Sequence, residues 1–327
     1  MTEHEEVVHC DDAIVAIHST VLGPALGGVR FRPYPSQEAA LEDALRLSKA
    51  MTYKAAVAGL DYGGGKAVIV GDPHGPDHDA RIRAFAECVD SLRGRYLTAE
   101  DVGTTQADID LARTITPYVT GTSQGSGDPS PPTALGVFCA MTATAETLWG
   151  SADLAGRHVV VQGVGKVGRA LVRRLLDAGC RVTVADVDPA ATVIQGVEVV
   201  APESVHAVPC DVFSPCALGA VLSRHTIPEL ACAAVVGSAN NQLVDDACAD
   251  LLHERGVLYV PDYVANAGGI VNIAEEPGGY DAARAEAAVR RIHDTVLRVL
   301  AAADREGVTP LAAANRLAEA RIAAARA

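Results

Sequence analysis

A glycine-rich segment in the second half of the chain has the residue types and spacing that bind a dinucleotide. Gly163, Gly165 and Gly168 form a complete G-x-G-x-x-G pattern, with Lys166 and Val167 between the last two glycines. An apolar run, VVVQ, precedes the pattern and an amphipathic run, VGRALVRRLLDAG, continues it, which is the required order of strand, turn and helix. The glycines allow a tight turn and a close approach to a pyrophosphate, which the helix N-terminus attracts.

An acidic residue follows this fingerprint at the distance typical of NAD sites. Asp186 ends the run RVTVAD, 18 residues after Gly168, where a carboxylate can accept hydrogen bonds from the adenosine ribose. The same charge repels a 2′-phosphate, so the sequence favours NAD over NADP. Asp188 is a second candidate for this task, and a glycine-rich turn without a ligand is the alternative interpretation.

Two lysines in the first half could supply a base. Lys54 lies in MTYKAAVAGL and Lys66 in DYGGGKAVIV, and both adjoin apolar runs. Removal from water lowers the pKa of an ammonium group and so makes lysine usable as a base near neutral pH. The three glycines before Lys66 indicate a turn that a ligand can approach closely. Taken alone, a lysine beside such a turn is more often a surface residue.

Two other motifs share these letters and do not fit. A P-loop needs glycine where the chain has Leu60 and Ser or Thr where it has Ala67. Tyr62 and Lys66 have the spacing of the tyrosine and lysine of short-chain dehydrogenases, but glycines fill the gap and the pair precedes the nucleotide fingerprint. The lysines therefore need another explanation.

The elements that must position these residues form two parts with different patterns of predicted strands and helices. The segment 121–133, GTSQGSGDPSPPT, predicts a crossing between domains. Before it, short β-like runs alternate with helical ones, the clearest being a helix over 36–51 that Ser36 can cap. After it, apolar strands alternate with helices, which implies a parallel sheet covered on both faces. Apolar positions at helical spacing over 281–303 and Thr309-Pro310 indicate C-terminal helices.

The composition narrows the class of protein. A length of 327 residues suggests two domains, and 49% hydrophobic with 21% charged residues is typical of a folded globular chain. A net charge of −14 leaves no basic surface for nucleic acid or anionic lipid. The acidic segment MTEHEEVVHCDDA argues against export, and no apolar run reaches the ~18 residues of a membrane span. We therefore expect a cytoplasmic protein that acts on a small molecule.

Cysteine and histidine usage gives no sign of a metal centre. The eight cysteines are scattered without a C-x-x-C pair, which favours reduced, mostly buried thiols. One cluster could bind a metal, namely Asp72, His74, Asp77, His78 and Asp79 in DPHGPDHD. Its proline and glycine content indicates a solvated loop instead, so we expect no metal site.

Taken together, these motifs resemble the amino acid dehydrogenases that act on glutamate, leucine, phenylalanine and valine, and most closely the leucine and valine enzymes. The likeness runs in family order from about residue 6 to the C-terminus. The matching segments are GPALGGVRF, LEDALRLSKAMTYK, AGLDYGGGKAVIVGDP, GRYLTAEDVGTTQADID, GSGDPSPPTALGVF, VQGVGKVG, SPCALGAVL, GSANNQL and PDYVANAGGIVN.

This resemblance implies an α/β fold of two domains. Residues 1–130 with 296–327 would form a domain for substrate binding, catalysis and oligomerisation, to which the C-terminal helices return. Residues 131–295 would form a doubly wound Rossmann domain that binds NAD. A homo-oligomer, a dimer or larger, is also expected.

The implied activity is the reversible oxidative deamination of an apolar L-amino acid, such as leucine or valine, to the 2-oxo acid, ammonia and NADH. An enzyme for phenylalanine or another aromatic L-amino acid and a catalytically silent NAD-binding regulator are the alternatives. A 2-hydroxy acid dehydrogenase would need a histidine base and an arginine clamp, and the matched motifs of the first domain hold no such histidine.

The resemblance also implies roles for residues of the first domain. Lys54 would bind the substrate α-carboxylate. Lys66, with a lowered pKa, would activate the water that attacks the iminium carbon, and Asp101 would exchange protons with the amino group and the carbinolamine. The backbone of Gly27 and Gly28 would help to hold the carboxylate and amino group.

Further roles follow for the second domain and for the substrate side chain. Asn266 would assist Gly27 and Gly28, while Thr133 and Asn240 would contact the nicotinamide end of the cofactor. Apolar side chains around the site would select the substrate, and the candidates by position are Leu26, Met51 and Ala99.

Overall fold

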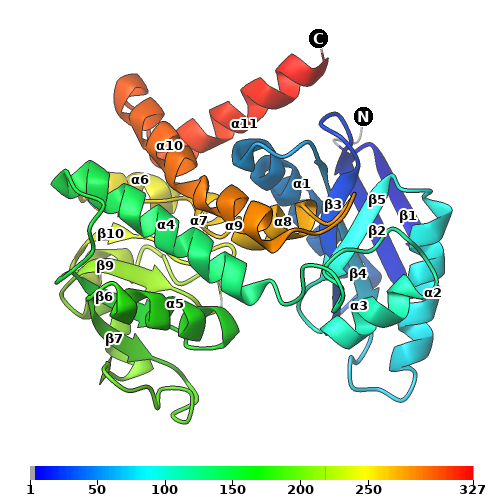
Figure 1. Ribbon diagram of the computed structural model, residues 1–327, viewed down its shortest axis with the longest axis horizontal. Helices are drawn as coiled ribbons and strands as arrows, with labels where there is room; N and C mark the ends of the chain where they lie inside the picture. Colours follow the sequence, from blue (N-terminus) through cyan, green and yellow to red (C-terminus); the bar gives the residue numbers. More distant parts are fainter. Residues whose placement is uncertain (1–3, 218, 327) are drawn as a thin grey trace. The chain divides into compact units, whose positions relative to one another are not determined.

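The chain forms two compact units, each built around its own sheet (Figure 1). The computed structural model describes residues 4–217 and 219–326. Unit 1 takes in the described residues of Met1–Pro129, Ile270–Ala285 and Ala318–Ala327, and unit 2 those of Ser130–Gly269 and Glu286–Leu317. The break after Pro129 falls within the segment 121–133.

Unit 1 contains a five-stranded mixed sheet with the order β1-β2-β4-β3-β5. Its strands are β1 (Glu6–Cys10), β2 (Ala13–Ser19), β3 (Ala25–Arg32), β4 (Gly63–Val70) and β5 (Tyr96–Glu100). Strand β3 lies parallel to both β4 and β5, whereas β2 is antiparallel to β1 and β4. The helices of this unit's first segment are α1 (Gln37–Ala58), α2 (His78–Ser91) and α3 (Gln106–Arg113).

Helices cover both faces of this sheet (Figure 1). Alternate residues of a strand point to opposite faces. Ile14 and Ala16 of β2 pack with the apolar residues of α1, whereas Val15 and Ile17 pack with those of α2 and α3. Both faces of β2 are therefore buried, which explains its continuous apolar run.

The three glycines before Lys66 begin strand β4 and do not form the expected turn. A Cβ at Gly64 would lie 2.1 Å from the backbone nitrogen of Thr52 in α1, and a Cβ at Gly65 would lie 2.6 Å from the ring of Tyr96. Small residues are needed here because α1 and β4 approach each other closely. These glycines therefore have a role in packing, and their role in ligand approach stays a prediction.

Unit 2 contains a six-stranded parallel sheet with the order β11-β10-β9-β6-β7-β8. This is the strand order of a Rossmann fold, two βαβαβ halves that meet between β6 and β9. The strands are β6 (His158–Gln162), β7 (Arg181–Ala185), β8 (Glu198–Val199), β9 (Cys210–Pro215), β10 (Cys232–Val235) and β11 (Leu258–Tyr259). The α/β class and the doubly wound sheet are confirmed.

The helices of unit 2 include α4 (Ser130–Trp149), α5 (Lys166–Asp177), α6 (Ala247–Glu254), α7 (Asp262–Ala265) and α10 (Ile292–Glu306), with short 3-10 helices η1 (Pro202–Ala207) and η2 (Ile227–Glu229). The chain passes between the units within α8 (Gly268–Ala274), α9 (Ala282–Arg290) and α11 (Pro310–Arg326). The apolar repeat over 281–303 thus forms two helices that meet at Arg291.

The units differ from the expected domain ranges near the C-terminus. Helix α10 packs against α4 and α7, so residues 296–317 belong to unit 2 and not to the first domain. Residues 270–285, expected in the Rossmann domain, belong to unit 1. The apolar stripe of α10, which includes Val296, Val299 and Leu300, is buried, and this burial holds the helix in unit 2.

One pair of cysteines departs from the expectation that all eight are reduced. Cys10 of β1 and Cys88 of α2 form a disulfide, with their Cα atoms 6.1 Å apart. The two residues are 78 positions apart in the sequence, and α2 packs against β1 and so brings them together. The other six cysteines are free, and three of them are buried.

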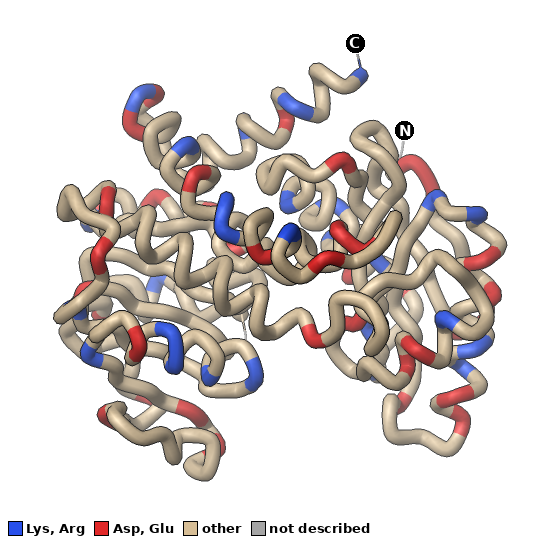
Figure 2. The backbone as a smooth tube through the Cα atoms, in the orientation of Figure 1, with Lys and Arg blue, Asp and Glu red and all other residues tan. Residues whose placement is uncertain are grey.

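Charge is distributed without a block of one sign. Acidic and basic residues are interspersed along the backbone of each unit (Figure 2). Among residues 4–217 and 219–326, no helix combines the length and the apolar character needed to span a membrane.

Candidate functional site

The candidate site of unit 1 lies on the face of the sheet that α1 covers. Val29 and Phe31 pack on the opposite face, so the alternation of β3 turns Arg30 towards α1. Val68 packs with α1, so Lys66 faces the same way. Asp101 directly follows β5, which pairs in parallel with β3. Three neighbouring strands thus bring these charged side chains to one place.

Lys66 and Asp101 form an ion pair at the centre of this site. The Nζ of Lys66 lies 2.9 Å from Oδ2 of Asp101. Lys66 is only 5% exposed, and the side chain of Asp101 is 17% exposed. The structure therefore brings together the two residues that were expected to exchange protons, and it holds the lysine away from bulk water.

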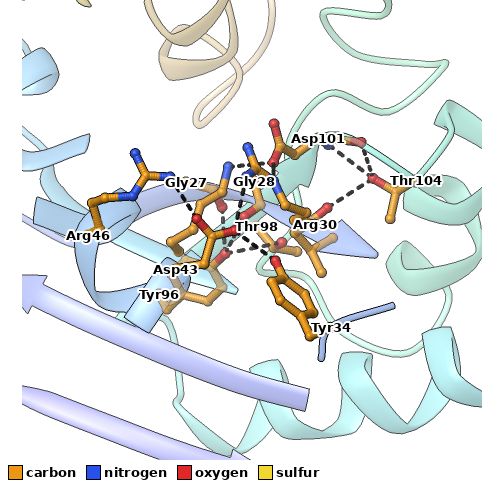
Figure 3. A network of polar contacts seen from close by, with 12 residues as sticks. Gly27, Gly28, Arg30, Tyr34, Asp43, Arg46, Tyr96, Thr98, Asp101 and Thr104 are labelled. Carbon is orange, nitrogen blue, oxygen red and sulfur yellow. Dashed lines mark hydrogen bonds and ion pairs between the residues drawn. The ribbon is translucent and has the colours of Figure 1, made fainter. Parts of the chain in front are cut away.

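Arg30 is a site residue that the sequence patterns did not single out. Its Nε lies 3.0 Å from the same Oδ2 of Asp101, and its Nη1 lies 3.0 Å from Oδ2 of Asp43 in α1 (Figure 3). Asp43 also accepts hydrogen bonds from the hydroxyl of Tyr34 at 2.8 Å and from Nη2 of Arg46 at 2.7 Å. The only sequence signal for Arg30 is its place two residues after Gly28, on the same face of β3.

The neighbouring cations keep Asp101 ionised. Burial alone raises the pKa of this carboxyl, but the charges of Lys66 and Arg30 outweigh burial and lower the pKa to about 2. The backbone is fixed as well, because the N–H of Asp101 donates to the hydroxyl of Thr104 at 3.0 Å. Asp101 is therefore an anion at neutral pH while both cations are charged.

Two glycines expected to hold the substrate lie beside these charges. A Cβ at Gly28 would lie 2.9 Å from the Cβ of Asp101, so glycine leaves room for the carboxylate. The carbonyl of Gly27 accepts a hydrogen bond from the buried hydroxyl of Tyr96 at 2.5 Å. This carbonyl is therefore already engaged by the protein. Lys54 lies half-buried near the end of α1.

The residues expected to contact the substrate side chain belong to the same region of unit 1. Leu26 of β3 and Ala99 of β5 are both buried. The alternation of side chains along each strand turns both of them to the face of the sheet that α1 covers. A Cβ built on Gly27 would lie 3.4 Å from Cγ of Met51 in α1. The structure thus groups three apolar side chains near the charged site, and their role in selectivity stays a prediction.

The nucleotide fingerprint of unit 2 joins strand β6 to helix α5. Gly163 has a φ of +94°, which favours glycine, and a Cβ at Gly168 would lie 2.0 Å from the carbonyl oxygen of Gly163. A Cβ at Gly165 would meet nothing within 4 Å. Lys166 and Val167 begin α5, whose first turn has no side-chain cap. The open side of Gly165 and the helix N-terminus that follows it suit a phosphate.

Asp186 lies beside this turn, directly after β7. Its Oδ2 accepts a hydrogen bond from the N–H of Val164 at 2.7 Å, and its Oδ1 accepts one from the N–H of Asp188 at 2.9 Å. Each oxygen keeps a second lone pair for a ribose hydroxyl. Val187, the next residue, is 89% exposed. These contacts fix the carboxylate at the edge of the fingerprint.

The other three expected residues of unit 2 lie near one another. The Nδ2 of Asn266 donates to Oδ1 of Asn240 at 2.8 Å and to the carbonyl of Ser238 at 3.1 Å. The Oδ1 of Asn266 is buried and has no partner among the described residues. A Cβ at Gly268 would lie 3.0 Å from Cα of Thr133, so the first turn of α4 contacts the NAGG segment.

One residue of the cluster in DPHGPDHD contacts a helix of unit 1. Nε2 of His78 lies 2.6 Å from Oδ1 of Asp108 in α3. Within residues 4–217 and 219–326, no group of three or more histidine, cysteine or carboxylate side chains is arranged to hold a metal ion.

Comparison with known proteins identifies the family of the chain. Residues 1–117 match the family model described as Glu/Leu/Phe/Val dehydrogenase, dimerisation domain, and residues 187–327 match Glutamate/Leucine/Phenylalanine/Valine dehydrogenase. Leucine dehydrogenase of Geobacillus stearothermophilus is 47% identical over 98% of this chain and 91% of its own. Valine dehydrogenase of Streptomyces virginiae is 46% identical over 99% and 95%.

A solved structure extends the likeness to the fold. The crystal structure of L-tryptophan dehydrogenase from Nostoc punctiforme is similar with a TM-score of 0.86 and 43% identity, over 99% of this chain and 97% of that one. The extent of these matches supports one conclusion. The chain belongs to the Glu/Leu/Phe/Val dehydrogenase family and is an amino acid dehydrogenase, an oxidoreductase that acts on CH-NH2 donors with a nicotinamide cofactor.

Proposed function

We propose that this dehydrogenase catalyses the NAD-dependent, reversible oxidative deamination of an apolar L-amino acid, with leucine or valine as the preferred substrate. The observation that carries the proposal is the buried contact of 2.9 Å between Lys66 and Asp101. A lysine held out of water beside a carboxylate is suited to move protons to and from a nitrogen and a water.

The proposed roles in unit 1 account for each proton. Lys54 binds the α-carboxylate through its charge, and Asp101 takes a proton from the substrate ammonium group. A bound NAD would supply the acceptor for the hydride of Cα, and loss of that hydride would leave the substrate as an iminium ion. The neutral amine of Lys66 then takes a proton from the water that attacks the iminium carbon. Asp101 returns its proton to nitrogen, and the departing ammonia takes the proton of the carbinolamine hydroxyl, so that the 2-oxo acid and an ammonium ion are released while Lys66 keeps the proton from water.

The charges of the site suit this sequence of steps. An iminium ion is repelled by a cation and stabilised by an anion. The Asp101 carboxylate can offset the positive charge as it develops. A neutral Lys66 at the same moment removes one cation from the site.

Features of unit 2 support NAD as the cofactor. The open side of Gly165 and the N-terminus of α5 suit the pyrophosphate. The carboxylate of Asp186 suits the ribose hydroxyls and repels a 2′-phosphate. The buried Oδ1 of Asn266 without a partner suits the amino group of the substrate, and Thr133 and Asn240 suit the nicotinamide end.

The apolar residues of unit 1 support an aliphatic substrate. Leu26, Met51 and Ala99 offer no polar group to a substrate side chain. Such pockets discriminate weakly, since one methylene is worth about 1 to 3 kcal/mol. The second candidate is an aromatic substrate, tryptophan or phenylalanine, which the likeness to L-tryptophan dehydrogenase favours.

The proposal also includes the assembly and the compartment: the protein forms a homo-oligomer in the cytoplasm. Residues 1–117 match a model described as a dimerisation domain, and β1 pairs with β2 alone at the edge of its sheet. An edge strand of this kind can pair with a second copy. Six of the eight cysteines are free, which supports a reducing compartment, whereas the Cys10–Cys88 disulfide is the observation against it. Light scattering of the purified protein measures the assembly, and a monomer would contradict it.

A spectrophotometric screen of L-amino acids with NAD and with NADP tests the function. We expect NADH to form with the highest kcat/KM for leucine or valine, and weak activity with NADP. A higher kcat/KM for tryptophan or phenylalanine would select the second candidate. Thermal stabilisation by NAD without NADH formation from any amino acid would contradict the enzyme and indicate a silent NAD-binding regulator.

A further inference from the structure

Two cations contact one oxygen of the Asp101 carboxylate. Nζ of Lys66 and Nε of Arg30 lie 2.9 Å and 3.0 Å from the same Oδ2. This arrangement leaves Oδ1 as the oxygen through which the carboxylate can exchange a proton with a substrate. The orientation of the carboxylate therefore depends on both cations.

The far end of Arg30 is anchored outside the proposed reaction. Its Nη1 contacts Oδ2 of Asp43 at 3.0 Å, and its side chain is 13% exposed. Asp43 is itself held by Tyr34 and Arg46 (Figure 3). Because a guanidinium group is planar, a contact at Nη1 also fixes the direction of Nε. Helix α1 thus determines how Arg30 meets Asp101.

The two cations differ in what happens to them during turnover. Lys66 changes charge in the proposed mechanism, whereas a guanidinium group keeps its proton at every working pH. When Lys66 is neutral, the contact of 3.0 Å with Arg30 still gives the Asp101 carboxylate a charged partner. A buried anion without such a partner is costly.

We propose that Arg30 is a positioning residue that holds the Asp101 carboxylate as an oriented anion while Lys66 changes its charge. Arg30 acts through Asp101 and touches no reacting atom. This inference rests on the proposed function, because it assigns the proton transfers to Lys66 and Asp101.

The sharpest test follows Asp101 itself and needs no activity. Lys66→Met mimics the neutral lysine, and the 13C signal of the Asp101 carboxyl, assigned with Asp101→Asn, is recorded against pH. In Lys66→Met we expect Asp101 to remain ionised at neutral pH. In the double variant Lys66→Met, Arg30→Gln we expect it to take up its proton at a clearly higher pH. The same titration in the single and the double variant would overturn the inference.

Kinetics give a second test in the active enzyme. For Arg30→Gln we expect kcat to fall at least about tenfold, and the acid limb of the profile of kcat/KM against pH to move to higher pH. Arg30→Lys restores the charge without the bridge to Asp43, so we expect the acid limb to return towards that of the unmodified enzyme while kcat stays low. Arg95→Gln, which removes an exposed partner of Glu6, is the matched control.

The outcomes distinguish the two hypotheses. An Arg30→Gln protein that folds and keeps the kcat and pH profile of the unmodified enzyme would overturn the inference alone. If Arg30→Gln does not fold, an unchanged kcat in Arg30→Lys would overturn it. Failure of the unmodified protein to oxidise any amino acid would overturn the proposed function, whatever the titration of Asp101 shows.

Discussion

At the scale of single residues, Lys66 is the side chain on which the proposed chemistry depends most. Lys66→Ala removes the proposed base and leaves Asp101 paired with Arg30. We therefore expect kcat to fall by about 10² to 10⁴-fold, the range that general base catalysis contributes. Lys49→Ala, on α1, is the matched lysine control and should keep most of the activity. Steady-state rates of NADH formation measure both, and equal rates would contradict the assignment.

The sequence predicted the pair of Lys66 and Asp101 but not the residue that joins it to α1. Both members of the pair lie in motifs with a recognisable context, an apolar run after glycine and an acid after a strand. The contact of Arg30 with Asp101 spans 71 positions and that with Asp43 spans 13. Both contacts arise from strand pairing and helix packing, which no local sequence pattern encodes. In addition, an arginine in a predicted strand is commonly interpreted as a surface residue.

At the scale of elements, a histidine links the starts of two helices. His78 begins α2, and Asp108 belongs to the first turn of α3, where its carboxylate and Thr105 form a reciprocal capping box. The 2.6 Å contact between Nε2 of His78 and Oδ1 of Asp108 joins these ends. The hydrogen bond to Asp108 raises the pKa of His78 above its usual value, although burial opposes the shift. The protonated imidazole is therefore favoured in the folded state.

This contact predicts a pH-dependent loss of stability in His78→Asn. A raised pKa means that the stabilisation is complete below the unfolded value of about 6.5 and is lost as pH rises through the folded value. We expect His78→Asn to lower Tm by several degrees at pH near 6, for a contact worth about 1 to 2 kcal/mol, and by less near pH 9. His74→Asn is the exposed control from the same loop. A pH-independent loss in His78→Asn would contradict the explanation.

The elements show where sequence patterns succeed and where they stop. The helix expected from residue 36 begins at Gln37 with Ser36 as its cap, because capping and apolar spacing are local properties. The glycine triplet suggests a turn, yet it begins strand β4. Glycine is required there because Thr52 approaches Gly64 closely, and the sequence does not show that contact. The disulfide between Cys10 and Cys88 was missed for the same reason.

At the scale of the whole molecule, the chain divides the proposed task between two units. The segment rich in Gly, Ser and Pro predicted the position of the first crossing, since such residues are poor in regular structure. The later crossings lie inside α8, α9 and α11, where the periodicity continues without a break. Periodicity identifies the apolar stripe of α10, but it does not say whether that stripe packs on unit 1 or on unit 2.

This division predicts that cofactor binding and proton transfer can be removed separately. A Cβ at Gly165 would meet no protein atom within 4 Å, so Gly165→Val should fold normally. Its side chain would occupy the space through which a pyrophosphate approaches the backbone. We therefore expect Gly165→Val to lose the rise in Tm that NAD gives the unmodified protein.

The fingerprint lies in unit 2, whereas Lys66 belongs to unit 1. Lys66→Ala should therefore keep the rise in Tm with NAD while losing turnover. Saturation at 100 times Kd stabilises the folded state by about 2.7 kcal/mol, enough to measure by calorimetry. Loss of the NAD-dependent shift in Lys66→Ala, or its retention in Gly165→Val, would mean that the two tasks are not divided between the units in this way.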